Sequence, residues 1–83
     1  IYPNPNRDGQ LTVNMDGLYV EDGTTLDIDV YDMLGKRVHA ERATAADGRM
    51  LRTMDLSNNL PAGIYMVNVT VEGQLFTQRL VMQ

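Results

Sequence analysis

The feature that most constrains this chain is a two-residue alternation of apolar and polar side chains, repeatedly interrupted by glycine-containing turns. Leu26, Ile28 and Val30 alternate with aspartates, and the same period recurs around Leu11 and Tyr65. Successive side chains of a strand point to opposite faces, so this period predicts strands with one buried face. Asp-Gly pairs, which favour tight turns, stand at Asp8-Gly9, Asp16-Gly17, Asp22-Gly23 and Asp47-Gly48.

Short strands punctuated this often predict an all-β fold, an Ig-like β-sandwich of about seven mainly antiparallel strands. We expect the strands near residues 1–3, 10–15, 25–32, 36–45, 50–56, 63–72 and 74–82. In the fourth strand, Val38 and Ala40 are expected on the apolar face, with His39 exposed. A second interpretation, a helical turn over 41–46, stays open.

Length and charge narrow the possible functions. The chain has 83 residues, which suits one domain over 1–83. A net charge of −4 without a basic cluster argues against nucleic acid or an anionic membrane as a partner. The absence of cysteine excludes disulfides, thiol catalysis and Cys-based zinc sites. Because the sequence starts at Ile1 and shows no signal peptide, we expect a piece of a larger precursor.

Four segments, taken in order, carry a specific resemblance. They read IYPNP at 1–5, VYDMLGKRV at 30–38, DLSNNLPAGIYMV at 55–67 and QRLVMQ at 78–83. In this order and at this spacing they resemble the type A C-terminal sorting domain of the type IX (Por) secretion system. The resemblance covers the whole chain, with one extra Asn in the third segment and Met82-Gln83 as departures at the end.

This resemblance implies a secretion signal and not an enzyme. A precursor with an upstream cargo domain would cross the inner membrane of a Bacteroidota-type cell. Outer-membrane translocon and shuttle proteins would then recognise this domain, and a sortase-like peptidase would remove it. The cargo would be secreted, or held at the cell surface by lipopolysaccharide, after passing through the periplasm. The resemblance implies no cofactor, no metal site and no catalytic residue.

The residues that match the motifs are also expected to build the fold. Pro3 and Pro5 lack backbone donors and suit an entry segment. Gly35 is expected at positive φ in a hairpin, and Tyr65 is expected to bury its ring and bond through its hydroxyl. The full set of matched residues is Tyr2, Pro3, Asn4, Pro5, Asp32, Gly35, Asp55, Leu56, Gly63, Tyr65, Arg79, Leu80 and Val81.

Other polar residues offer weaker chemistry. Asp27 and Asp29 lie about 7 Å apart along one predicted strand and are expected on an outward polar face. An acidic loop is the better metal candidate because calcium ligands concentrate in turns. That loop carries Asp16, Glu21 and Asp22. His39 and Ser57 show no partners in the pattern, and Ser57 is expected to be a turn residue.

One alternative from another functional class stays open, a carbohydrate-binding or adhesive accessory module. Such modules present several exposed aromatic rings in one plane. With Tyr2 and Tyr65 expected to be structural, only Tyr19 and Tyr31 remain for that role. Met33, in the predicted hairpin, is the methionine that we expect to be exposed.

Overall fold

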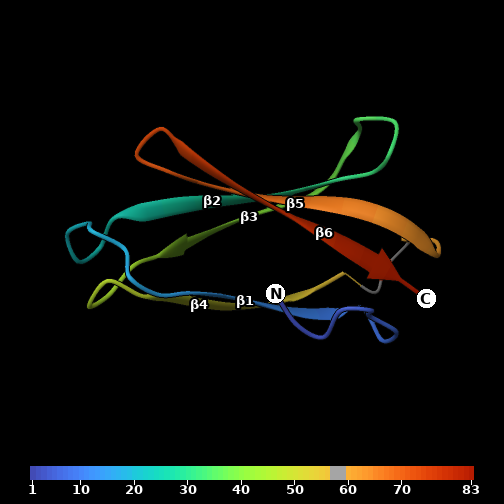
Figure 1. The fold of residues 1–83 in the computed structure, drawn as a ribbon, viewed down its shortest axis with the longest axis horizontal. Helices are drawn as coiled ribbons and strands as arrows, with labels where there is room; N and C mark the ends of the chain where they lie inside the picture. Colours follow the sequence, from blue (N-terminus) through green and yellow to red (C-terminus); the bar gives the residue numbers. More distant parts are fainter. Residues whose placement is uncertain (57–59) are drawn as a thin grey trace.

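The structure, a computed structural model that describes residues 1–56 and 60–83, is a sandwich of two antiparallel sheets (Figure 1). Its strands are β1 (Gln10–Met15), β2 (Thr25–Tyr31), β3 (Arg37–Thr44), β4 (Met50–Asp55), β5 (Gly63–Val71) and β6 (Gln74–Met82). The larger sheet has the order β3-β2-β5-β6, and β1 pairs with β4 in the smaller one. The predicted all-β sandwich is thus confirmed. The described residues form no helix, and therefore no apolar helix that could span a membrane.

The core lies between the two sheets and is built by the predicted alternation. The inward residues of β2, β5 and β1 are almost completely buried, and Leu80 and Met82 complete the core from the end of β6. Burial of these apolar groups is the main stabilising contribution in a domain of this size. The core residues are Leu11, Val13, Leu26, Ile28, Val30, Ala45, Met50, Met54, Leu56, Tyr65, Val67, Val69, Val71, Leu80 and Met82.

Residues 1–3, predicted as a first strand, instead make a single antiparallel bridge. The main chain of Tyr2 exchanges two hydrogen bonds with Thr12 of β1, of 3.0 and 2.8 Å. Pro3 and Pro5 follow, both after cis peptide bonds, and neither can donate to a ladder. The N-terminal segment therefore crosses from β1 to the far sheet without continuing a strand. This leaves six strands in the described residues, where about seven were expected.

β3 differs from the prediction because of a β-bulge. Its pairing with β2 places His39 opposite Val30 and Arg37 opposite Tyr31, so Val38 is an extra residue. A bulge reverses which side chains face inward beyond it. As a result Ala40 is exposed, while His39 faces the sandwich interior and is half-buried. The predicted inward Ala40 and exposed His39 are therefore wrong, whereas Val38 is half-buried and packs against the core as expected.

The connections follow the predicted turn chemistry. β3 continues to Thr44, so the alternative helical turn over 41–46 does not form. Asp47 and Gly48, both at positive φ, then lead into β4 through paired bonds between Ala46 and Arg49. Glu72 and Gly73, with φ of 48° and 78°, form the two-residue connection between β5 and β6. Ser57, expected in a turn, lies outside the described residues.

Candidate functional site

The motif segments, far apart in sequence, meet at one end of the sandwich (Figure 1). The connection from β2 to β3 lies at this end, and in the ladder Gly63 stands opposite Met82 and Tyr65 opposite Leu80. The smaller sheet contributes its own end, where the Leu56 N–H donates to the Gly9 carbonyl at 2.6 Å. We call this the motif end, made by residues 3–9, 32–36, 55–56, 60–65 and 79–83.

The N-terminal motif is bound to the C-terminal strand by asparagine side chains. The Asn4 Nδ2 donates to the Arg79 carbonyl at 2.8 Å, and its Oδ1 accepts from the Val81 N–H at 3.0 Å. The main chain of Asn6 then donates to the Val81 carbonyl at 2.7 Å and accepts from the Gln83 N–H at 2.8 Å. This segment thereby takes the place of a neighbouring strand along the last residues of β6.

Asn6 organises the N-terminal segment from inside and is a residue that the sequence reading missed. It is completely buried, the one buried polar residue among those described. Its Oδ1 accepts from the Gly9 N–H and its Nδ2 donates to the Gln10 carbonyl, both at 2.7 Å. Asparagine often bonds to nearby backbone at turns, so its place before Asp8-Gly9 was the available signal.

Asp32 shapes the hairpin between β2 and β3. Its Oδ1 accepts hydrogen bonds from the N–H groups of Leu34 and Lys36, each at 2.9 Å, and its carbonyl accepts from Gly35. Gly35 has the predicted positive φ, 83°. The turn holds Met33 and Leu34 outward, 67% and 93% exposed. Two apolar side chains are therefore displayed in solvent at the motif end.

Tyr65 is buried beside this hairpin, as predicted. Its ring is 4% exposed, and its hydroxyl donates to the Pro61 carbonyl at 2.6 Å. Burial raises the pKa of Tyr65 above 10.0, and the negative charge of Asp32 adds to the rise. Gly63 opens β5 with φ of 154°, a conformation that other residues rarely adopt. Tyr65, Asp32 and Gly63 thus act first as fold determinants.

The remaining motif residues divide between core and surface. Leu80 is completely buried and Leu56 is 2% exposed, whereas Arg79 and Asp55 are exposed. Tyr2 was expected to be structural, and although its main chain is bridged, its side chain leaves the residue 51% exposed. Pro3, Pro5 and Val81 complete the set at the surface or half-buried.

Three of the five acidic candidates pair with arginines. On the outer face of the larger sheet, Asp27 lies 3.0 Å from Arg42 and Asp29 lies 3.4 Å from Arg37. In the acidic loop, Asp16 lies 3.6 Å from Arg49. Over the described part of the chain, no three His, Asp or Glu side chains come together as metal ligands would.

His39 joins a small polar cluster on the inner face of β3. Its Nε2 lies 3.6 Å from Glu41 Oε2, and Arg52 of β4 reaches Glu41 Oε1 at 3.2 Å. Neither His39 Nε2 nor Glu41 Oε2 has a hydrogen-bond partner among the described residues. This cluster fills the place between β3 and β4 where an apolar face was expected.

Comparison with known proteins gives one family. A family model described as the secretion system C-terminal sorting domain matches residues 1–83, the full length of the chain. No curated protein and no solved structure matches the chain. This family is one of sorting signals on secreted or surface-attached cargo, and its domain is non-catalytic. With its motif segments gathered at one end of a two-sheet sandwich, the chain belongs to the secretion system C-terminal sorting domain family.

Proposed function

We propose that this domain directs a covalently attached cargo protein across the outer membrane through the type IX secretion system, and that the motif end is the surface recognised. The observation that carries the second part is the convergence of all four motif segments at that end. A partner that reads this end contacts residues from both chain ends and the hairpin together. Such a partner would bind the folded domain and not merely a short linear peptide.

The surface chemistry of the motif end suits protein recognition. Leu34 and Met33 are exposed apolar groups on a hydrogen-bonded turn, and such groups serve as anchors in interfaces. Lys36 and Arg79, both exposed, add positive charge at the same end. We propose translocon and shuttle proteins as the partners, with an upstream cargo domain in the same precursor.

The finer steps belong to the same proposal. In the type A subgroup, a sortase-like peptidase at the cell surface would separate the domain from its cargo. The cargo would then be released or joined to lipopolysaccharide. In this scheme the domain is the substrate of the peptidase and carries no catalytic group.

The decisive experiment is a reporter export assay. An inner-membrane signal, a fluorescent protein and residues 1–83 are fused and expressed in a cell with a working type IX system, which is then fractionated. We expect the reporter at the surface or in the medium. Reporter trapped in the periplasm would show an incomplete signal, and equal export with and without residues 1–83 would refute the function.

A matched pair of variants tests the recognised surface. Leu34 is 93% exposed at the motif end, and Tyr19 is 101% exposed in the loop at the other end (Figure 1). Both Leu34→Glu and Tyr19→Glu should fold, because neither side chain is packed. We expect Leu34→Glu to reduce export and Tyr19→Glu to leave it unchanged. The reverse result would place the recognised surface elsewhere.

The carbohydrate-binding alternative can be tested directly. Of the two rings expected for that role, Tyr19 is fully exposed in the loop before β2, whereas Tyr31 is half-buried at the far end of β2, so they lie in different parts of the surface. Binding of the isolated domain to a sugar array would favour that alternative over sorting.

A further inference from the structure

The outer edge of β6 is covered along only half of its length. Asn4 and Asn6 bond to the main chain of Arg79 and Val81 on this edge. In an antiparallel strand, the N–H and C=O groups of alternate residues point to the same side. Leu75 and Thr77 therefore also direct their main-chain groups outward. No hydrogen bond from the described residues covers that side of residues 74–78.

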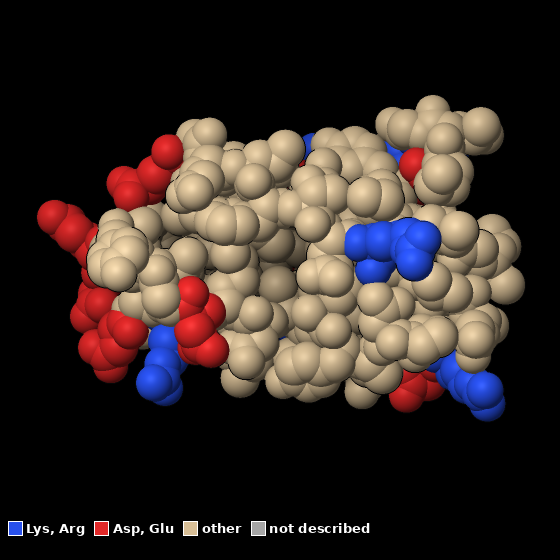
Figure 2. Space-filling view, viewed as in Figure 1, with Lys and Arg blue, Asp and Glu red and all other residues tan. Residues whose placement is uncertain are grey.

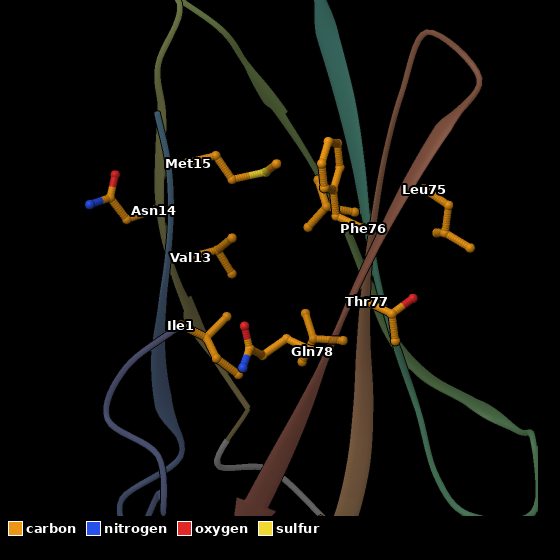
Figure 3. A pocket seen from close by; sticks show the side chains of 10 residues that line it. Ile1, Val13, Asn14, Met15, Leu75, Phe76, Thr77 and Gln78 are labelled. Carbon is orange, nitrogen blue, oxygen red and sulfur yellow. The ribbon is translucent and has the colours of Figure 1, made fainter. Parts of the chain in front are cut away.

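An apolar groove opens beside this uncovered stretch. Figure 3 shows Ile1, Val13 and Met15 on one side of it, facing Phe76 and Gln78 of β6 on the other. Its volume is about 420 Å³, and Val67 and Val69 of β5 also line it. It exists because the two-stranded sheet covers only part of the four-stranded one. Figure 2 shows this hollow on a face with mostly uncharged side chains.

Residues 74–78 carry none of the usual protections of an edge strand. Natural proteins protect such edges with charges, prolines, bulges or a covering segment. This stretch has no charge and no proline, and its pairing with β5 runs without a register shift. Leu75 and Phe76 are also 58% and 37% exposed. The stretch can therefore accept another strand.

We propose that a second copy of this domain pairs with this edge, antiparallel and about a two-fold axis through Phe76. In this register Phe76 faces Phe76 of the second copy, and Leu75 and Thr77 exchange hydrogen bonds with Thr77 and Leu75 across the axis. The two four-stranded sheets become one continuous sheet. The inference goes beyond the sorting function and does not depend on it.

The length of the uncovered stretch of β6 and the charges at its two ends favour a second copy of this domain as the partner that pairs with it. The uncovered stretch ends at the Glu72-Gly73 turn on one side and at Asn4 on the other, so residues 74–78 match their own antiparallel copy. The same register puts Arg79 opposite Gly73 of the second copy, next to its Glu72. Opposite charges thus meet at both ends of the interface, and no like charges oppose each other within it.

Sedimentation over a concentration series, with charge variants, tests the proposal. Leu75→Lys with Thr77→Lys sets lysines opposite each other twice across the axis, and Leu75→Glu with Thr77→Lys sets opposite charges there. Both double variants change exposed side chains only. We expect wild type to dimerise with rising concentration, the two-lysine variant to bind about tenfold more weakly, and the Glu-Lys variant to recover. A wild-type chain that stays monomeric, or variants that behave alike, would overturn the proposal.

Because the chain contains no cysteine, single cysteines can test the register. Phe76→Cys places two thiols across the axis in a non-hydrogen-bonded pair, where a disulfide can form. Tyr19→Cys, at a more exposed position, is the control for random collisions. We expect oxidation to give covalent dimer much faster for Phe76→Cys. A dimer with no such preference uses a different interface, which would also overturn the proposal.

Discussion

Three short polar side chains, those of Asn4, Asn6 and Asp32, hold the motif end together. Each accepts hydrogen bonds from main-chain N–H groups that would otherwise lack a partner. The Gly9 N–H bonded to Asn6 is buried, and a buried N–H left without a partner costs about 1–3 kcal/mol, whereas water can replace the exposed bonds of Asn4 and Asp32. We therefore expect any effect of these three residues on export to arise through their effect on the fold.

Asn6→Ala should lower the free energy of unfolding by about 2–4 kcal/mol. The change leaves the Gly9 N–H and the Gln10 carbonyl without their partner, and both losses occur at or near the core. Asn14→Ala, at an exposed position of β1, is the matched control and should change stability by less than about 0.5 kcal/mol. Urea denaturation measures both, and equal losses would contradict the buried role of Asn6.

Removing the ring of Tyr65 should cost far more than removing its hydroxyl. We expect about 3–5 kcal/mol for Tyr65→Ala, because the ring is buried, and about 1 kcal/mol for Tyr65→Phe, which loses only the bond to Pro61. Asp27→Ala, an exposed ion-pair residue, should stay within about 0.5 kcal/mol. If urea melts show that Asp27→Ala loses as much stability as Tyr65→Ala, the assignment of Tyr65 to the buried face and Asp27 to the exposed face is wrong.

Tyr65 should also make the domain less stable in alkali. Its pKa is raised in the folded state, so above pH 10 the unfolded chain loses this proton first and is favoured. The stabilisation that comes from keeping Tyr65 protonated is complete below the pKa of this tyrosine in the unfolded chain. It is lost as the pH rises through the pKa of Tyr65 in the folded domain. We expect the stability advantage of wild type over Tyr65→Phe to shrink above pH 10. An advantage that is constant with pH in urea melts would contradict this.

At the scale of elements, the strands whose alternation is unbroken were predictable and β3 was not. For β2 and β5, the period and the turn residues fix both the boundaries and the buried face. In β3 the bulge at Val38 inverts the face, and nothing in the local pattern marks it. The inward His39 and Glu41 follow from pairing with β2 and from Arg52 on β4, which are contacts distant in sequence.

The motif end was foreseeable only in part. The hairpin of Asp32 and Gly35 and the burial of Tyr65 follow from local chemistry. The contact between Asn4 and Arg79 depends on how the chain ends meet, which no local pattern specifies. Sequence reasoning therefore found many residues of the motif end, but it missed Asn6 and could not give their arrangement.

Gly63 should be required at the start of β5 for its backbone conformation. A Cβ there would meet no neighbouring atom, yet φ of 154° is strained for any other residue. We expect Gly63→Val to cost about 1–3 kcal/mol. Ala62→Val, one residue earlier and exposed, is the control and should be nearly neutral in thermal melts. If both variants melt at the wild-type temperature, the strain assignment is wrong.

At the scale of the whole molecule, the two ends of the sandwich differ in content. The motif end holds the family motifs, and the opposite end holds loops with acidic residues, seen as the gathered negative side chains in Figure 2. Arg49 is the partner of Asp16 there, and Asp22 accepts from the Asp47 N–H. The two ends of the sandwich therefore differ chemically. Only the motif end carries the N-terminal and the C-terminal motif segments together.

Deleting residues 79–83 should unfold most of the domain, whereas Arg79→Glu should not. The deletion removes Leu80 and Met82 from the core and the bonds to Asn4 and Asn6. Arg79 is exposed, so reversing its charge should change stability by less than about 0.5 kcal/mol. Circular dichroism and thermal melts compare the two. If export falls for Arg79→Glu while the fold persists, a partner reads that charge.

The hydrogen bonds between Asn4 and β6 also bear on how the cell could avoid exporting defective cargo. The bonded residues are separated by 75 and 77 positions in the sequence, so the surface they form does not exist until β6 has been synthesised and has docked. A chain that terminated early, or was cut within this domain, could not display it. We expect a machinery that reads this surface to reject such chains, so that export would also depend on complete synthesis of this domain.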